Sequence, residues 1–95
     1  MSQDPLLEVV DDTAAGRVGL RVDGSEVGHL TYQVQGGVIT IWHTEIDPAR
    51  EGQGLGSALV AEVLARAAAA ELAVSPVCPF VAAYIRRHPG CARTV

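Results

Sequence analysis

His43 and Glu45 are the residues whose types and spacing could move a proton. They lie two positions apart in a β-branched run that predicts an extended strand. Side chains of a strand alternate between faces, so we expect both residues to share a face with Ile39 and Ile41, about 7 Å from each other. A histidine beside a carboxylate can accept or relay a proton near neutral pH, although a solvated pair on a sheet face is the alternative. Trp42 points the other way and is expected to be part of the core.

A glycine-rich bend, Glu51-Gly52-Gln53-Gly54-Leu55-Gly56, follows this strand and precedes a helical run. Such a bend gathers unpaired backbone N–H groups at a helix N-terminus, where the helix dipole favours phosphate. Glycines let the backbone approach the ligand because they carry no Cβ. Gly56 is followed by Ser57-Ala58, which is not a P-loop, and the glycine spacing is not that of a dinucleotide fingerprint. The alternative is a turn that only caps the helix.

Four strands are predicted up to this bend, at residues 6–11, 17–23, 26–34 and 38–47. In the second of them Val18, Leu20 and Val22 alternate with polar residues, which is typical of a half-buried strand. Asp23-Gly24 and Gln35-Gly36-Gly37 predict tight hairpin turns. The strands are therefore expected to form an antiparallel meander.

A long helix, a short strand and a second helix are predicted to complete an α+β fold, at residues 54–72, 74–77 and 79–88. Five apolar side chains of the long helix fall within one arc at 100° per residue and are expected to face the core: Leu59, Val60, Val63, Leu64 and Ala67. Pro79 suits the first turn of the second helix, and Pro89-Gly90 ends it. Residues 91–95 are expected to form a loose tail.

Length and composition predict one globular domain over residues 1–95, of which 48% are hydrophobic. The net charge of −4 and the pI of about 5.1 argue against a nucleic-acid binder and suit a cationic partner. Residues 1–5 lack the features of a secretory signal, and residues 55–74 contain charges that argue against a membrane helix. With only two cysteines, we expect no disulfide framework. The sequence therefore predicts a cytoplasmic monomer or weak dimer with no metal site.

The segment from Ile46 to Val60 resembles the acetyl-CoA signature of GCN5-related N-acetyltransferases, Gln/Arg-x-x-Gly-x-Gly/Ala. The resemblance implies acetyl-CoA as the cofactor. Its pyrophosphate would be held mainly by backbone N–H groups in the segment Arg50, Glu51, Gly52, Gln53, Gly54, Leu55, Gly56 and Ser57. Glu51 stands where the family has Gln or Arg, so we expect weakened or altered phosphate contacts.

The same resemblance implies that the fourth and fifth strands splay apart around pantetheine. The fourth-strand backbone, including Thr44 and Ile46, would bond to pantetheine, and an N–H near Ile46 would stabilise the oxyanion. Residues 43–46 and 78–85 resemble a small stand-alone subfamily, which includes the proteins called N-acetyltransferase domain-containing protein 1. The two helices that the family usually has between its first two strands are replaced here by residues 12–16. We therefore expect a truncated version of the family fold with an open acceptor side.

Two further residues acquire candidate roles from the resemblance. Cys78 is expected to end the fifth strand, facing the acetyl group, and could be an acyl-accepting nucleophile with His43 as its partner. A small buried hydrophobic residue is the alternative. Tyr84 lies near the position where the family has a tyrosine that protonates the departing thiolate, and a packed tyrosine is its alternative. Cys91 is expected to be incidental.

The sequence predicts an N-acetyltransferase that transfers an acetyl group to an unidentified small amine or Lys side chain. Transfer occurs either by direct attack or through acetyl-Cys78. Two alternatives remain at this stage: a CoA-binding module without robust transferase activity, and a structural or interaction protein whose glycine bend is only a turn.

Overall fold

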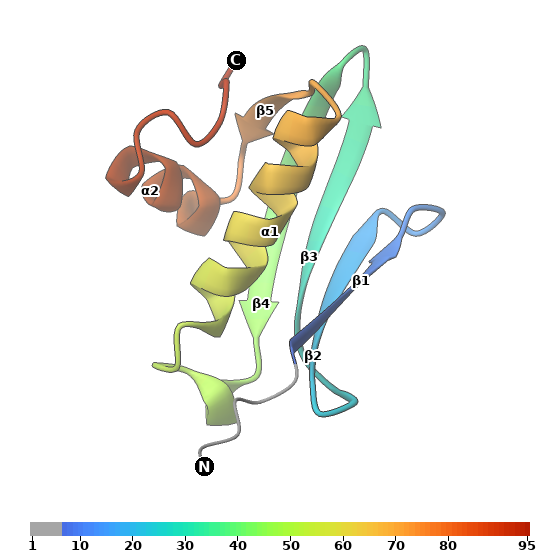
Figure 1. Cartoon of the computed structure of the whole chain (residues 1–95), viewed down its shortest axis with the longest axis vertical. Coiled ribbons are helices and arrows are strands. Elements are labelled where there is room, and N and C mark those ends of the chain that lie inside the picture. Colours follow the sequence, from blue (N-terminus) through green and yellow to red (C-terminus); the bar gives the residue numbers. More distant parts are fainter. Residues whose placement is uncertain (1–6) are drawn as a thin grey trace.

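The chain folds as one five-stranded sheet with two helices. The computed structural model describes residues 7–95, in the order β1 (Leu7–Asp12), β2 (Arg17–Val22), β3 (Ser25–Gln35), β4 (Val38–Ile46), a 3-10 helix (Pro48–Arg50), α1 (Leu55–Ala69), β5 (Ala73–Pro76) and α2 (Pro79–Arg87). Strands β1 to β4 pair antiparallel in chain order, and β5 pairs parallel with β4. Helix α1 crosses one face of the sheet, with α2 beside it (Figure 1). The predicted α+β fold is confirmed.

Both predicted hairpin turns are present, and their backbone angles explain their residue types. Asp23 and Gly24 have φ values of 50° and 85°, and Gly36 and Gly37 have φ values of 60° and 77°. Two consecutive residues with positive φ form the tight turn whose twist matches that of the flanking strands. Glycine adopts this conformation without steric strain, which is why the turns fall at these positions.

The core lies between the sheet and α1. The five apolar residues predicted to face the core from the long helix are all buried, so that prediction is confirmed. They pack against Val18, Leu20 and Leu30 of the meander and Ile41 of β4, among others. Burying a Leu or Val side chain in this way stabilises the fold by about 1.5–3 kcal/mol each. Neither helix in residues 7–95 is long and apolar enough to cross a bilayer.

Helix α1 ends earlier than predicted, at Ala69 instead of residue 72. Glu71 adopts a positive φ of 58°, and the Leu72 N–H donates to the Ala67 carbonyl at 2.8 Å. The chain must turn here because Ala73 already begins β5, where its N–H donates to the Gly37 carbonyl at 3.0 Å. The alanine run favours helix, but pairing with the sheet decides where the helix stops. Leu6 and the N-terminal residues 1–5 lie outside the described residues.

Residues 91–95 are not a loose tail, so that prediction is wrong. The Val74 N–H donates to the Arg93 carbonyl at 2.7 Å, and the Val95 N–H donates to the Val74 carbonyl at 3.0 Å. Cys91 and Ala92 are partly buried against the core. The outer edge of β5 carries backbone groups that need partners, and this segment supplies some of them.

A β-bulge at Trp42 reverses the alternation of β4. Thr31 pairs with His43, but the next β3 residue, Tyr32, pairs with Ile41, so Trp42 is an extra residue without a partner on β3. Before the bulge, Ile41 faces the core. After it, the core-facing positions are those opposite Leu30 and Gly28 of β3, which are Thr44 and Ile46.

Two expectations about β4 are therefore wrong. His43 and Glu45 do not share a face with Ile39 and Ile41, because the inserted residue moves them to the opposite face of the sheet. Trp42 is not part of the core, since it is 49% exposed.

Candidate functional site

Strands β4 and β5 separate at the bulge. Strand β4 pairs with β5 only from Val38 to Ile41, and the Cys78 N–H makes the last contact, donating to the Ile41 carbonyl at 2.9 Å. Pro76 ends β5, and Pro79 begins α2. Proline has no N–H to continue a ladder, so the sequence itself stops the pairing here. The edge of β4 from Trp42 to Ile46 is left without β5 beside it.

The glycine bend leads directly from this open edge into α1. The Asp47 carboxylate accepts from the Ala49 N–H at 3.0 Å and caps the 3-10 helix. Gly52 and Gly54 both have positive φ, at 84° and 76°. Gly54 is the N-cap of α1 and has no side chain with which to bond the first turn of the helix. The first N–H groups of α1 therefore remain available to an anion.

A pocket of about 360 Å³ lies between the end of β4 and the start of α1. Every residue predicted to contact the cofactor lines this pocket except Gln53. The lining consists of Thr44, Ile46, Arg50, Glu51, Gly52, Gly54, Leu55, Gly56, Ser57 and Phe80. The charges of Arg50 and Glu51 offset each other, so the attraction for an anion comes mainly from the backbone N–H groups and the helix dipole.

Phe80 is a pocket residue that sequence reasoning missed. It lies in the first turn of α2, and its ring rests against the first turn of α1. A Cβ atom built on Gly56 would be 2.9 Å from the Phe80 Cζ atom and 3.5 Å from the Ile46 Cγ1 atom. Gly56 therefore allows the ring to close one side of the pocket. The signal in the sequence was an aromatic residue directly after Pro79, at the start of a helix that must face the end of β4.

Cys78 lies at the base of the opening between the strands. It is the N-cap of α2 and is only 3% exposed. Its thiol donates to the Thr44 Oγ1 atom at 3.6 Å. Burial is the largest single influence on the Cys78 pKa and raises it. The backbone N–H groups of Val81 and Phe80, together with Thr44, outweigh burial, so the net Cys78 pKa is lowered.

The expected pairing of Cys78 with His43 is wrong. The bulge places His43 on the opposite face of β4 from Thr44, and Thr44 is the β4 side chain that contacts the thiol. The first N–H groups of α2 together with Thr44, and not an imidazole, favour the thiolate here.

His43 and Glu45 meet on the outer face of the sheet, together with a third residue. The His43 Nε2 atom lies 3.7 Å from the Glu45 Oε2 atom, and the His29 Nε2 atom lies at the same distance from that oxygen. The two imidazole centroids are 6.4 Å apart. The sequence does not single out His29, because its pairing with Glu45 depends on the register between β3 and β4.

Tyr84 does not join the other candidate residues in the contacts that the structure records. Its ring stacks on His88, with centroids 4.1 Å apart, and packs partly against the core. It is not among the residues that line the pocket at the glycine bend.

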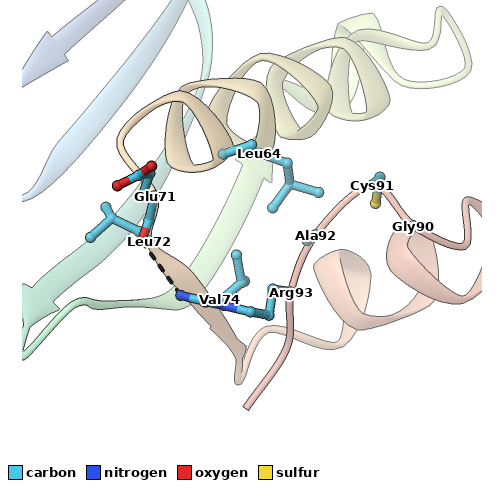
Figure 2. Close-up of a pocket in the computed structure, with 9 residues that line it drawn as sticks. Leu64, Glu71, Leu72, Val74, Gly90, Cys91, Ala92 and Arg93 are labelled. Atoms are coloured by element: carbon cyan, nitrogen blue, oxygen red, sulfur yellow. Dashed lines mark hydrogen bonds between the residues drawn. The ribbon is translucent and has the colours of Figure 1, made fainter.

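A larger hollow, of about 560 Å³, lies away from these residues. Figure 2 shows that it is formed by the end of α1, β5 and the C-terminal segment. The Arg93 guanidinium reaches the Glu71 carbonyl across it at 3.5 Å. None of the candidate catalytic or cofactor residues lines this hollow.

Comparisons with known proteins identify the family. A family profile described as GCN5-related N-acetyl-transferase matches residues 17–94. The chain therefore belongs to the GCN5-related N-acetyltransferase family. A search of curated proteins found no match.

Two solved structures share this fold. One is a GNAT-family acetyltransferase from Brucella melitensis in complex with acetyl-CoA, with a TM-score of 0.59 and 23% identity over 77% of this chain. The other is an acetyltransferase of the GNAT family from Desulfovibrio desulfuricans, with a TM-score of 0.55 and 24% identity over 61% of this chain. The matched regions cover 51% and 40% of those two chains. At these identities the likeness concerns the fold.

Proposed function

We propose that the chain is an acetyl-CoA-dependent N-acetyltransferase whose acceptor is a small amine or a Lys side chain. Family membership supports the reaction class. The observation that carries the proposal for this chain is the pocket where the open edge of β4 meets the uncapped N-terminus of α1. A pyrophosphate is the kind of group that such a helix start binds.

The residues present fit this cofactor. Cβ atoms built on Gly52 and Gly54 would meet no protein atom within 4 Å, so the space beside the bend is open to a ligand. Thr44 and Ile46 line the pocket from the open edge of β4, where pantetheine would lie. Arg50 and Glu51 bring opposite charges to the lining of the pocket, and the altered phosphate contacts expected from the sequence stay a prediction.

Acetyl-CoA would supply the acetyl group as a thioester. The N–H groups at the start of α1 would hold the pyrophosphate, and the backbone of β4 from Thr44 to Asp47 would hold pantetheine. An N–H near Ile46 would stabilise negative charge on the carbonyl oxygen as the amine attacks. Such donors act by fixed orientation, which the strand supplies.

The acceptor amine must lose a proton, and we assign this role to His43 and Glu45. Both lie on the outer face of β4, and both are well exposed. They can therefore meet an acceptor that approaches from the side of the sheet opposite α1. A carboxylate beside an imidazole can accept the ammonium proton near neutral pH.

A route through acetyl-Cys78 is the variant of this mechanism. The lowered pKa of Cys78 supports it, whereas the burial of the thiol favours direct attack by the amine. Mixing the protein with acetyl-CoA should give a burst of protein acetylation that Cys78→Ser abolishes, if the covalent route operates. Absence of an adduct across the pH range would leave only direct attack.

The role of Tyr84 as a proton donor to the departing CoA thiolate remains a prediction to be tested by Tyr84→Phe.

Calorimetric titration with acetyl-CoA tests the proposed cofactor site. We expect saturable binding by the wild type and about tenfold weaker binding by Gly54→Ala, whose Cβ enters the ligand space. Gly37→Ala is the matched control, because Gly37 has nearly the same φ (77° against 76°) and open surroundings, but lies in the β3–β4 turn. Equal affinity in the two variants, or no binding by the wild type, would remove the cofactor assignment.

A CoA-binding module without robust activity is the second candidate. In the part of the chain that the structure describes, no helix covers the outer face of the sheet, so nothing there encloses an acceptor. Acetyl-CoA binding without turnover across a panel of amines and peptides would favour this candidate. Turnover that is lost in His43→Ala and Glu45→Ala would favour the enzyme.

We also propose that residues 1–95 form a single domain and belong to the small stand-alone subfamily. One sheet and one core cluster in residues 7–95 support the single domain. Cys78 and Cys91 are both unpaired, which fits a reducing compartment such as the cytoplasm.

A further inference from the structure

His29 and Glu45 are direct cross-strand neighbours on the outer face of the sheet. They are opposed in the β3–β4 register, and the His29 Nε2 atom lies 3.7 Å from the Glu45 Oε2 atom. Directly opposed side chains are the pairs through which strands influence each other most strongly. His43 reaches the same oxygen from within β4, also at 3.7 Å. One carboxylate oxygen thus lies between two imidazoles.

The three side chains differ in how firmly they are held. The His29 side chain is 25% exposed, against 61% for His43 and 63% for Glu45. A half-buried ring has fewer conformations available than an exposed side chain, so it loses less entropy in holding a partner. His29 is therefore the most firmly held member of the cluster.

Other charged groups nearby do not replace His29 as the partner of Glu45. Arg17 makes two bonds of 2.7 Å to Glu26, one to each carboxylate oxygen. Arg21 also acts on Glu26, and the Asp47 carboxylate caps the 3-10 helix. Arg17, Glu26, His29, Glu45 and Asp47 line a shared hollow of about 300 Å³. Among these residues His29 is the cation-forming group in contact with Glu45.

The two imidazoles approach the same carboxylate oxygen. In each contact the closest distance, 3.7 Å, is to Oε2, so Oε1 is the oxygen farther from both rings. An incoming ammonium group needs such an acceptor in a fixed direction.

We propose that His29 is a positioning residue, which holds the Glu45 carboxylate by its Oε2 atom so that Oε1 faces the acceptor amine. This inference rests on the proposed function, since it gives Glu45 the role of proton acceptor. His29 itself touches neither substrate, and it acts through Glu45.

Three-bond NMR couplings of Glu45 in the protein without ligand test the positioning directly. We expect one dominant χ1 rotamer in the wild type and in His29→Gln, whose amide can donate to the carboxylate. In His29→Leu the Glu45 side chain should sample several χ1 rotamers, so its couplings should take averaged values. Gln33→Leu makes a similar polar-to-apolar change on the same face of β3 and should leave the Glu45 couplings unchanged. Averaged couplings in the wild type, or unchanged couplings in His29→Leu, would overturn the proposal.

Steady-state kinetics with acetyl-CoA and an accepted amine provide the second readout. His29→Leu should lower kcat by about ten- to a hundredfold, a part of what a general base contributes, with the KM for acetyl-CoA unchanged. His29→Gln should recover most of the loss, and a purely structural role would not predict such rescue. Failure to rescue with an ordered Glu45 would contradict the inference. A wild type that shows ordered Glu45 couplings but no turnover would instead contradict the proposed function.

Discussion

Thr44 and Glu45 are consecutive residues of β4 whose side chains lie on opposite faces of the sheet. The Thr44 hydroxyl contacts the Cys78 thiol on the side of the helices, and the Glu45 carboxylate contacts His29 on the outer side. One peptide unit therefore separates the lining of the proposed cofactor pocket from the proposed proton acceptor. The bulge at Trp42 sets this arrangement, because it determines which residues of β4 face each side.

Leu59 tests the packing of α1 against the sheet. It is fully buried, so Leu59→Ala should lower the free energy of unfolding by about 2–5 kcal/mol. Leu7→Ala is the control, since Leu7 is exposed on β1 and its loss should change stability by no more than about 0.5 kcal/mol. Urea denaturation followed by circular dichroism measures both values. Similar effects of the two substitutions would contradict the described core.

Gly56 and Phe80 should behave as a coupled pair. Replacing a helical Gly by Ala usually stabilises a helix by about 0.8–1 kcal/mol. Here the added Cβ would lie 2.9 Å from the Phe80 Cζ atom and push the ring away from the pocket wall. We therefore expect Gly56→Ala to stabilise the Phe80→Ala variant by the full amount and the wild type by less.

A double-mutant cycle measured by thermal or urea unfolding gives this coupling energy. The same Gly56→Ala variant should bind acetyl-CoA more weakly than the wild type, because the ring no longer closes the pocket. Additive stability effects would show that Gly56 and Phe80 are not in contact.

The regular parts of the fold were predictable because local rules decide them. The buried face of α1 follows from helical periodicity at Leu59, Val63 and Ala67, and the hairpins follow from Asp23-Gly24 and Gly36-Gly37. The glycine bend was also predictable, since its residues gather around one pocket simply by being consecutive.

The parts that failed depend on pairing between distant residues. A bulge adds one residue to one strand, and nothing local at Trp42 distinguishes it from a regular strand position. The roles of His29 and Phe80 require the β3–β4 register and the docking of α2, which one-dimensional periodicity does not contain. The residues nearest to the proposed chemistry are therefore those that the sequence placed least well.

Tyr32 should ionise at unusually high pH. Burial, a hydrogen bond of 2.7 Å from its hydroxyl to the Asp11 carboxylate, and the charge of that carboxylate raise the pKa of Tyr32 to about 12. Since the folded-state pKa lies above the unfolded value of about 10, the stability linked to this group is complete below pH 10. That stability is then lost as the pH rises through about 12.

Phenolate absorbance at alkaline pH checks this value. In a Tyr84→Phe background Tyr32 is the only tyrosine left, because the sequence contains two. Asp11→Asn should move the midpoint toward 10 without reaching it, since burial is the larger cause. A midpoint near 10 in a protein that is still folded would contradict the described contacts of Tyr32.

Thr44 should influence the ionisation of Cys78 although the two residues belong to different elements. The Thr44 hydroxyl and the first N–H groups of α2 lower the pKa of Cys78 against the opposing effect of burial. Thr44→Val keeps the shape of the side chain but removes the hydroxyl, so it should raise the Cys78 pKa and reduce the thiolate fraction at a given pH.

Thiolate absorbance near 240 nm reports this change in a Cys91→Ser background, which leaves Cys78 as the single cysteine. Thr40→Val is the control, because Thr40 lies before the bulge on β4 and pairs with Ser75 instead of contacting the thiol. An equal titration midpoint in Thr44→Val and Thr40→Val would mean that backbone N–H groups alone favour the Cys78 thiolate. An acetyl-Cys78 route would then have no support from the Thr44 side chain.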